Sequence, residues 1–124
     1  MKFRNVTVVC LALLTASMAW AGGAPAGKAQ GVMTDARGMS LYTFDKDVAG
    51  SGKSACSSEC LAIWPPLYAE TGAKADGDFS VIARDDGKTQ WAYKGKPLYY
   101  FAKDKTPGDT LGDDVKNVWH LIRD

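Results

Sequence analysis

Hydrophobic positions along this chain occur in short runs that Gly, Asp and Pro interrupt, a pattern typical of antiparallel β-structure. The runs rich in β-branched and aromatic residues predict strands at 32–35, 39–44, 79–83, 88–93, 98–101 and 118–122. Turn residues at 36–38, 85–87 and 94–96 favour hairpins between them. We therefore expect a mainly β protein.

One segment has a helical pattern instead. Ser54 can cap a short helix over Ala55–Ile63, and Trp64 stands before Pro65, which disfavours the helical conformation at Trp64. The predicted fold is a small single domain, mainly β, with one short helix.

The chain also repeats itself. The ten residues Gly38–Asp47 return at Gly95–Asp104 with six identities in register and a constant offset of 57 residues. Such a repeat indicates two copies of one supersecondary unit. We expect two related antiparallel β-hairpin repeats, at 32–70 and 79–124, within one β-rich domain at 32–124.

The N-terminus has the order of features found in secretory signal peptides. Lys2 and Arg4 precede an apolar core at 8–14, and Ala19-Trp20-Ala21 is a small-x-small cleavage site. The apolar core is shorter than the ~20 residues that a transmembrane helix needs. We expect a signal peptide at 1–21, a flexible leader at 22–31, and a periplasmic or secreted protein without a transmembrane segment in the mature chain.

Charge excludes two classes of partner. The whole chain has 15 basic and 14 acidic residues, and loss of Lys2 and Arg4 with the signal leaves 13 basic residues. The mature chain then has a formal charge of −1 and no basic patch in its sequence. Nucleic acid and anionic membranes are therefore not expected as partners.

The repeated motif is Tyr-x-Phe-x-x-Asp, and it allows two interpretations. Its residues are Tyr42, Phe44 and Asp47, then Tyr99, Phe101 and Asp104. They could form a ligand surface of aromatic faces and carboxylates. Alternatively, the aromatic rings fill the core face of each hairpin, and each Asp ends a strand by accepting N–H bonds in the next turn. The second interpretation is favoured.

Three cysteines are present, and Cys10 leaves with the signal peptide. Cys56 and Cys60 would then pair as a disulfide in an oxidising compartment. The alternative is a copper or thiol-redox site, because two thiolates four residues apart share one helix face and soft sulfur suits Cu(I). His120 is the single histidine and could be a third ligand, an arrangement whose spacing resembles that of Sco-type copper chaperones.

The acidic loop near the C-terminus contains Asp109, Asp113 and Asp114. These acids lack the ordered spacing of a calcium loop, so a solvated loop is expected.

A family resemblance covers the sequence between Gly31 and Ile122. It rests on both repeats and on three further segments: Cys-Ser-Ser-Glu-Cys, Trp-Pro-Pro-Leu and the terminal Trp-His-Leu-Ile. The chain resembles the bacterial family called "secreted repeat of unknown function", predicted lipoproteins with a Tyr-x-[Phe/Trp/Tyr]-x-x-Asp motif. The resemblance implies export and a two-repeat organisation, and no established catalytic residue or cofactor. Unlike lipoprotein members, this chain lacks a lipid-attachment cysteine, because Cys10 lies inside the apolar core.

Together these features predict an exported, non-catalytic protein of the cell envelope. It would bind an unidentified envelope partner or small ligand and need no cofactor. The alternative is a periplasmic copper-handling or thiol-redox protein that uses Cys56, Cys60 and possibly His120.

Overall fold

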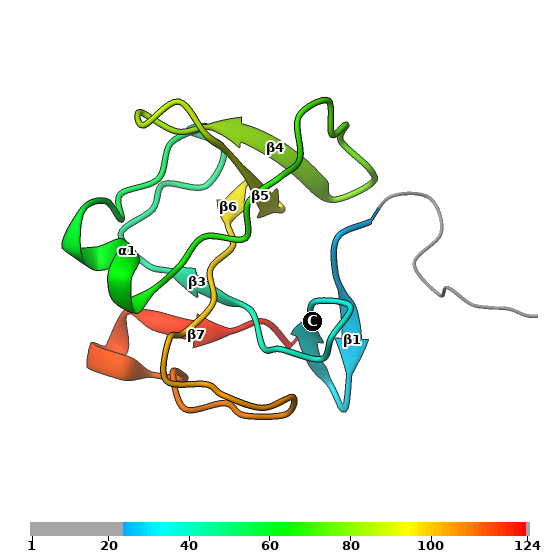
Figure 1. Ribbon diagram of the computed structural model, residues 1–124, viewed down its shortest axis with the longest axis vertical. Coiled ribbons are helices and arrows are strands. Elements are labelled where there is room, and N and C mark those ends of the chain that lie inside the picture. Colours follow the sequence, from blue (N-terminus) through cyan, green and yellow to red (C-terminus); the bar gives the residue numbers. More distant parts are fainter. Residues whose placement is uncertain (1–23, 124) are drawn as a thin grey trace, which may run out of the picture.

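The computed structural model describes residues 24–123 of the chain, so the expected signal peptide at 1–21 lies outside the described residues. The described part consists of small antiparallel sheets with one short α-helix (Figure 1). The predicted fold class, mainly β with one short helix, is therefore confirmed.

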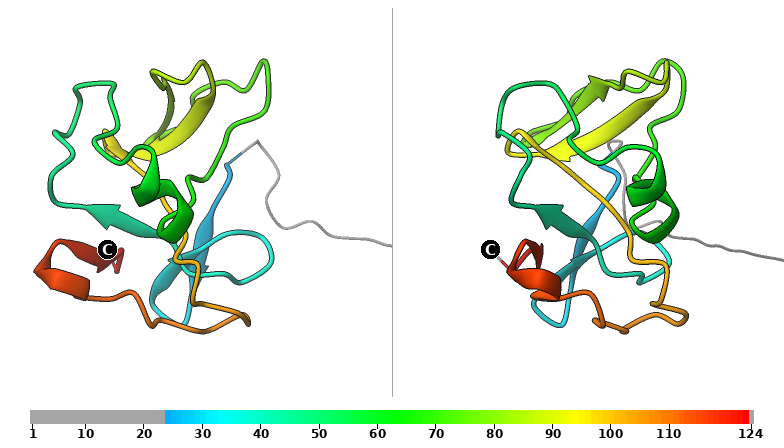
Figure 2. Two further views of the ribbon diagram at one scale, coloured as in Figure 1. Left: turned by 60° about the vertical axis from the view of Figure 1, so that its left-hand side comes forward. Right: turned by 90° about the vertical axis from the view of Figure 1, so that its left-hand side faces the viewer.

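Three sheets contain the seven strands of the described residues. A first hairpin pairs β1 (Gly27–Ala29) with β2 (Val32–Thr34). A second pair joins β3 (Tyr42–Phe44) to β7 (Trp119–Leu121). The third sheet has the order β4 (Phe79–Ala83), β5 (Thr89–Tyr93), β6 (Lys96–Pro97). Figure 2 shows the sheet with β4 and β5 at one end of the molecule and the β3–β7 pair toward the other.

The helices are short. The α-helix α1 spans Glu59–Ile63, and the 3-10 helix η1 spans Val115–Asn117. The α-helix ends before Trp64, as the following proline predicts. It begins at Glu59, later than the predicted Ala55, with Ser58 rather than Ser54 at its N-cap position. The Ser54 hydroxyl instead accepts the Cys56 N–H and bonds the Tyr99 hydroxyl.

The N-terminal hairpin corrects one expectation. Gly27–Ala29 was predicted to belong to a flexible leader, but it is a strand in register with Val32–Thr34. The two turn residues between these strands, Gln30 and Gly31, both have positive φ, at 54° and 81°. That is the turn geometry that matches the twist of paired strands. Residues 22 and 23 lie outside the described part of the chain.

The regular strand predicted at 98–101 is not observed at those residues. Tyr99 makes only isolated bridges, to Tyr42 and to Pro66, and the regular strand β6 lies just before it at Lys96–Pro97. The segment that faces it contains Pro65 and Pro66, which have no N–H to donate to a ladder. A regular strand pair cannot extend across that position. Likewise, only Tyr42–Phe44 of the predicted 39–44 is regular strand, with a bridge at Ser40.

The two repeats are intertwined. Strand β3 of the first repeat pairs with β7 of the second, in the register Tyr42 to Leu121 and Phe44 to Trp119. At the centre, the backbones of Tyr42 and Tyr99 exchange two hydrogen bonds of 2.8 and 3.0 Å. Each repeat therefore completes the other at this point, since β3 and β7 each pair with a strand of the other repeat, whereas β4, β5 and β6 pair within the second.

Two further backbone bonds follow the same symmetry. The Ala102 N–H donates to the Ile63 carbonyl at 2.8 Å, and the Asp45 N–H donates to the Val118 carbonyl at 2.7 Å. Ala102 and Asp45 are related by the 57-residue offset, and Ile63 and Val118 each precede a tryptophan. The chain thus pairs the motif segment of one repeat with the tryptophan segment of the other.

Two apolar clusters form the core. The first is mainly aromatic and holds the motif rings with both of these tryptophans: Tyr42, Phe44, Cys56, Trp64, Tyr99, Phe101, Trp119 and Leu121. The second is mainly aliphatic: Ala26, Met33, Leu41, Leu67, Trp91, Leu98 and Ile122. Leu41 and Leu98, each one residue before a motif tyrosine, are both fully buried in the second cluster.

Candidate functional site

The motif tyrosines and aspartates bond across the two repeats. The Tyr42 hydroxyl donates to Asp104 Oδ2 at 2.6 Å, and the Tyr99 hydroxyl donates to Asp47 Oδ2 at 2.7 Å. Both tyrosines have no exposed surface, and both aspartates are buried. The motif therefore forms a reciprocal pair of bonds, in which each repeat supplies a tyrosine to the aspartate of the other.

The second carboxylate oxygen of each aspartate accepts a backbone N–H from a loop of its own repeat. Asp47 Oδ1 accepts from Ala55 at 2.5 Å, and Asp104 Oδ1 accepts from Leu111 at 2.9 Å. The expectation that these aspartates accept N–H bonds after the strand thus describes half of their role. Sequence reasoning missed the other half, the partner tyrosine, because it lies in the other repeat.

Burial sets the ionisation of these groups. Desolvation raises the pKa of Tyr42 and Tyr99 well above their usual range, and the hydrogen bond of Tyr42 to Asp104 raises the pKa of Tyr42 further. Burial also raises the pKa of Asp47, although the Ala55 N–H and the Tyr99 hydroxyl act against it. Both phenols therefore keep their protons and act as hydrogen-bond donors.

The motif phenylalanines lie at the ends of a stack of four rings. Phe44 stacks on Trp119 at 4.1 Å between centroids, Trp119 on Trp64 at 3.8 Å, and Trp64 on Phe101 at 4.3 Å. The order again alternates between the repeats. Because the rings are buried against one another, the motif does not present an aromatic surface to a ligand.

The glycine that opens each repeated segment has a conformational reason. Gly95 has φ of 86°, and a Cβ at this position would lie 2.7 Å from the Gly50 nitrogen. Gly38 has φ of 89°, and its Cβ would lie 3.0 Å from Cβ of Pro107. Both positions require positive φ and close approach, which glycine allows.

The two cysteines are joined to each other. Their Sγ atoms are 2.00 Å apart and their Cα atoms 5.3 Å apart. Cys56 is fully buried, and the buried Arg84 donates to its carbonyl at 3.0 Å. The disulfide therefore lies against the aromatic cluster and fixes the loop that leads into α1.

His120 is not part of this sulfur site. Its Nε2 lies 2.8 Å from Asp45 Oδ2 and its Nδ1 lies 3.0 Å from Asp114 Oδ1. The hydrogen bond with Asp45 is the main cause that raises the pKa of His120, with burial acting against it. The structure thus separates the proposed copper ligands, since the sulfurs bond each other and the imidazole lies between two carboxylates.

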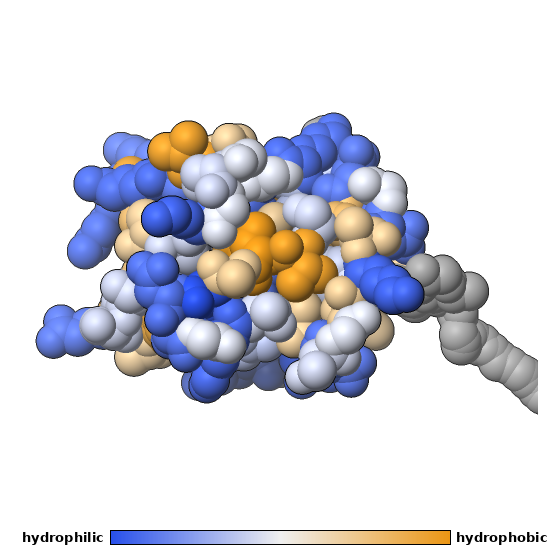
Figure 3. Space-filling view, turned by 90° about the horizontal axis from the view of Figure 1, so that it is seen from above, coloured by the Kyte–Doolittle hydropathy of each residue, from blue (hydrophilic) through white to orange (hydrophobic). Residues whose placement is uncertain are grey.

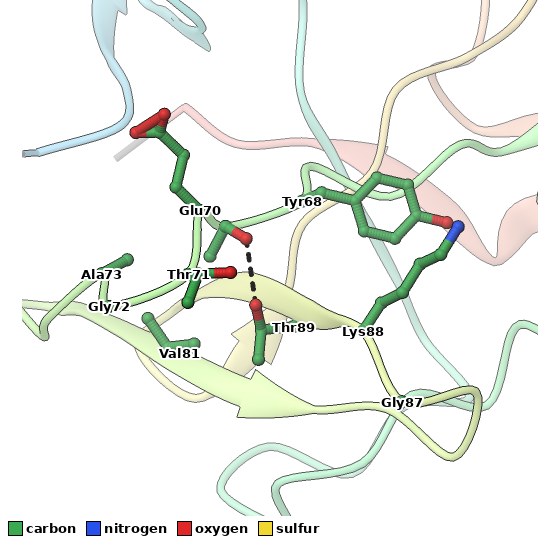
Figure 4. Close-up of a pocket in the computed structure, with 10 residues that line it drawn as sticks. Tyr68, Glu70, Thr71, Gly72, Ala73, Val81, Gly87, Lys88 and Thr89 are labelled. Carbon is green, nitrogen blue, oxygen red and sulfur yellow. Dashed lines mark hydrogen bonds between the residues drawn. The ribbon is translucent and has the colours of Figure 1, made fainter.

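A hollow of about 420 Å³ lies beside the sheet of β4 and β5. Figure 4 shows Tyr68 and Lys88 at one end of it and Glu70 at the other. The lining residues come from 68–73, where the first repeat ends, and from β4, β5 and the turn between them: Tyr68, Ala69, Glu70, Thr71, Gly72, Ala73, Val81, Gly87, Lys88 and Thr89. No sequence motif marked these residues as a site.

Tyr68 differs from the buried motif tyrosines. It is 43% exposed, and the Lys88 ammonium lies 5.2 Å from its ring centroid, within reach of a cation–π interaction. The side of the molecule on which β4 lies also carries an apolar area surrounded by hydrophilic residues (Figure 3). An exposed aromatic ring and a cation therefore lie together at the hollow.

These features describe a small intertwined two-repeat β protein with a structural motif inside and an open hollow outside. The chain belongs to the family described as "secreted repeat of unknown function", whose family model matches residues 26–68 and 80–123. The two matched segments are the two intertwined repeats, and the family description agrees with the expected export. No curated protein and no solved structure matches the chain.

Within the described residues, no helix has both the length and the apolar character needed to cross a membrane.

Proposed function

We propose that this protein is an exported, non-catalytic binding protein of the cell envelope, and that its ligand or partner binds at the hollow beside Tyr68. The observation that carries the proposal is the exposure of Tyr68, 43%, with the Lys88 ammonium over its ring. A large aromatic side chain at an open hollow offers apolar contact area that the core does not use.

Hydrogen bonds between the two segments hold the walls of the hollow together. The Ala69 N–H donates to the Thr89 carbonyl at 2.9 Å, and the Thr89 hydroxyl donates to the Ala69 carbonyl at 3.0 Å. Tyr68 forms a bridge with Gln90 of β5. The end of the first repeat is thereby fixed to the second repeat, which supports a preformed site of the kind that small ligands use.

The side chains define a ligand chemistry. Tyr68 supplies a ring, Val81 and the nearby alanines supply apolar contacts, and Lys88 supplies a positive charge. These groups suit a small ligand, or a partner side chain, with a flat or apolar part and an anionic group.

The burial of the Tyr-x-Phe-x-x-Asp motif supports a non-catalytic role. Its carboxylates and hydroxyls, which are the residue types of acid–base chemistry, bond one another inside the core. The groups left at the hollow are suited to binding.

The test uses the mature protein labelled with ¹⁵N and a pair of probes of equal shape, benzoate and benzamide. We expect benzoate to shift the amide signals of residues 68–73 and 88–89 in NMR spectra, and benzamide to shift them less. Tyr68→Ala and Lys88→Ala should weaken the benzoate effect. Lys103→Ala, at an exposed lysine that does not line the hollow, is the control.

The site assignment is wrong if benzoate shifts signals elsewhere, or if the two hollow variants bind it as the control does. Export to the periplasm or beyond is tested separately by N-terminal sequencing of the exported chain. The expected first residue is Gly22, after cleavage that follows Ala21. A chain that still begins at Met1 would contradict it.

A further inference from the structure

We propose that His120, Asp113 and Asp114 form a binding site for a divalent transition metal ion such as Zn²⁺, with Asp45 holding the imidazole. One nitrogen of His120 and one carboxylate oxygen from each of Asp113 and Asp114 lie within 4.8 Å of one another. The site lies apart from the lining of the hollow and does not depend on the proposed binding function.

The fold brings these residues together from three parts of the chain. His120 is the central residue of β7, where its neighbours Trp119 and Leu121 are buried and the imidazole is on the other face, 35% exposed. Asp45 follows β3 directly, and the register places Thr43 opposite His120. The Asp45 carboxylate therefore reaches the imidazole from the neighbouring strand.

The loop before η1 supplies the two other carboxylates, and backbone bonds to β7 hold it in place. The Asp114 N–H donates to the Trp119 carbonyl at 2.7 Å, and Asp113 Oδ1 accepts the Leu121 N–H at 3.1 Å. The positions of the acids relative to His120 are thus set by strand pairing as well as by the side chains.

Two carboxylates flank the imidazole, and their charge can be balanced by a second proton on the ring or by a metal ion. Nε2 faces the Asp45 carboxylate at 2.8 Å, and Nδ1 faces the Asp114 carboxylate at 3.0 Å. A neutral imidazole has one N–H, so it can donate to only one of them. With the proton on Nε2, the Nδ1 lone pair faces an oxygen lone pair, and a metal ion bound there removes this repulsion.

Asp45 then has the role that a carboxylate commonly plays beside a metal-binding histidine. It accepts the N–H of the nitrogen that does not bind the metal, and so fixes the tautomer and the ring orientation. Asp45 is thus a positioning residue, and the ligands are Nδ1 of His120 with the carboxylates of Asp113 and Asp114.

The separations are close to those of a metal site. Zn²⁺ lies about 2.0–2.2 Å from nitrogen and oxygen ligands, so two ligands at the tetrahedral angle are roughly 3.3–3.6 Å apart. Nδ1 and Asp114 Oδ1 are 3.0 Å apart and all three ligand atoms lie within 4.8 Å of one another, so small rotations of these side chains bring them to ligand distance. A set of one imidazole and two carboxylates favours Zn²⁺, Ni²⁺ or Cu²⁺ over Ca²⁺, which prefers six to eight oxygens.

A metal ion that enters the site must displace an arginine side chain. Arg123 Nη2 lies 3.2 Å from Asp113 Oδ2, so the metal would replace the guanidinium as the cation beside this oxygen. The Arg123 side chain is 61% exposed and can turn into solvent. Asp114 is 69% exposed, which leaves a path for a hydrated ion to enter.

The experiment is Zn²⁺ titration of the mature, disulfide-bonded protein near neutral pH by calorimetry, with ¹⁵N NMR of the imidazole. Because the chain has a single histidine, every imidazole signal belongs to His120. We expect one Zn²⁺ per chain and a shift of the Nδ1 signal to a metal-bound position. Co²⁺ should compete for the site, and Ca²⁺ should not.

Variants identify the ligands. His120→Ala and Asp114→Asn should each weaken Zn²⁺ binding at least tenfold, and Asp45→Asn should weaken it by about 10–100-fold. Asp78→Asn, at an exposed acid just before β4, should leave the affinity unchanged. Melting curves without metal show that each variant is folded, and the wild-type imidazole spectrum gives an answer even if a variant fails to fold.

Two results would overturn the proposal. One is Zn²⁺ affinity that survives His120→Ala. The other is an imidazole that titrates with pH but does not respond to Zn²⁺, in which case the cation between the carboxylates is a proton.

Discussion

Replacing Tyr42 by Phe removes one hydroxyl from the centre of the intertwined core. That hydroxyl donates to Asp104 at 2.6 Å and accepts the Gly112 N–H at 3.1 Å, and the tyrosine has no exposed surface. A hydrogen bond to a charged group contributes about 1.5–3 kcal/mol to stability, and an unsatisfied buried N–H costs about 1–3 kcal/mol. Because Asp104 keeps its bond from the Leu111 N–H, we expect the free energy of unfolding to fall by about 2–4 kcal/mol.

Urea denaturation of the disulfide-bonded protein measures this loss as a lower midpoint with an unchanged slope. Tyr68→Phe is the matched control, since the same atom is removed from an exposed tyrosine, and it should change stability by less than about 0.5 kcal/mol. If Tyr42→Phe were as mild as this control, the Tyr42–Asp104 bond would not stabilise the fold and the reasoning would be refuted.

Three further predictions concern the core, a turn and a buried carboxylate. Phe44→Ala and Phe101→Ala each remove an end of the four-ring stack and should lower the free energy of unfolding by about 3–5 kcal/mol. Thermal melting measures this loss, and unchanged melting temperatures in both variants would place these rings at the surface. Gly95→Ala forces a side chain into positive φ, with its Cβ 2.7 Å from the Gly50 nitrogen, and should lower the urea midpoint clearly, whereas an unchanged midpoint would argue against this close approach. Burial raises the pKa of Asp35, but hydrogen bonds from Tyr100 and the Met39 N–H outweigh burial, so the pKa lies below its usual value. The ionised Asp35 therefore stabilises the fold above the unfolded-state pKa, and this contribution is lost as pH falls through the folded-state pKa. Acid titration of stability should therefore be less steep in Asp35→Asn than in the wild type, and identical profiles would count against this pKa shift.

Local chemistry explains which elements were predictable from the sequence. The strand at Phe79–Ala83 was predicted with its observed bounds, and the adjacent turn at 85–87 has the residues that a hairpin needs. The helix end before Trp64 follows from the proline beside it. The strand at Gly27–Ala29 was missed because its Gly-Lys-Ala composition has no β-preference, and the positive φ of Gln30 cannot be read from glutamine.

The candidate sites depend on pairing between distant segments, and this was the part that could not be predicted. Tyr42 and Asp104 are 62 residues apart, and the sequence contains no local signal that each motif bonds the other repeat. One signal was present, because a repeat of this size cannot bury its apolar face alone and must pack on its copy. The contact of His120 with Asp45 follows from the β3–β7 register, which joins the two repeats, so this neighbour was not predictable either.

The reciprocal exchange between the repeats is the central claim, and double-mutant cycles test it directly. The cycles use Tyr→Phe and Asp→Asn variants and measure the coupling energy by urea denaturation for all four pairings of Tyr42 and Tyr99 with Asp47 and Asp104. We expect coupling of about 0.5–3 kcal/mol for Tyr42 with Asp104 and for Tyr99 with Asp47. The within-repeat pairs, Tyr42 with Asp47 and Tyr99 with Asp104, should show clearly smaller coupling. Stronger coupling within the repeats than between them would contradict the intertwined arrangement.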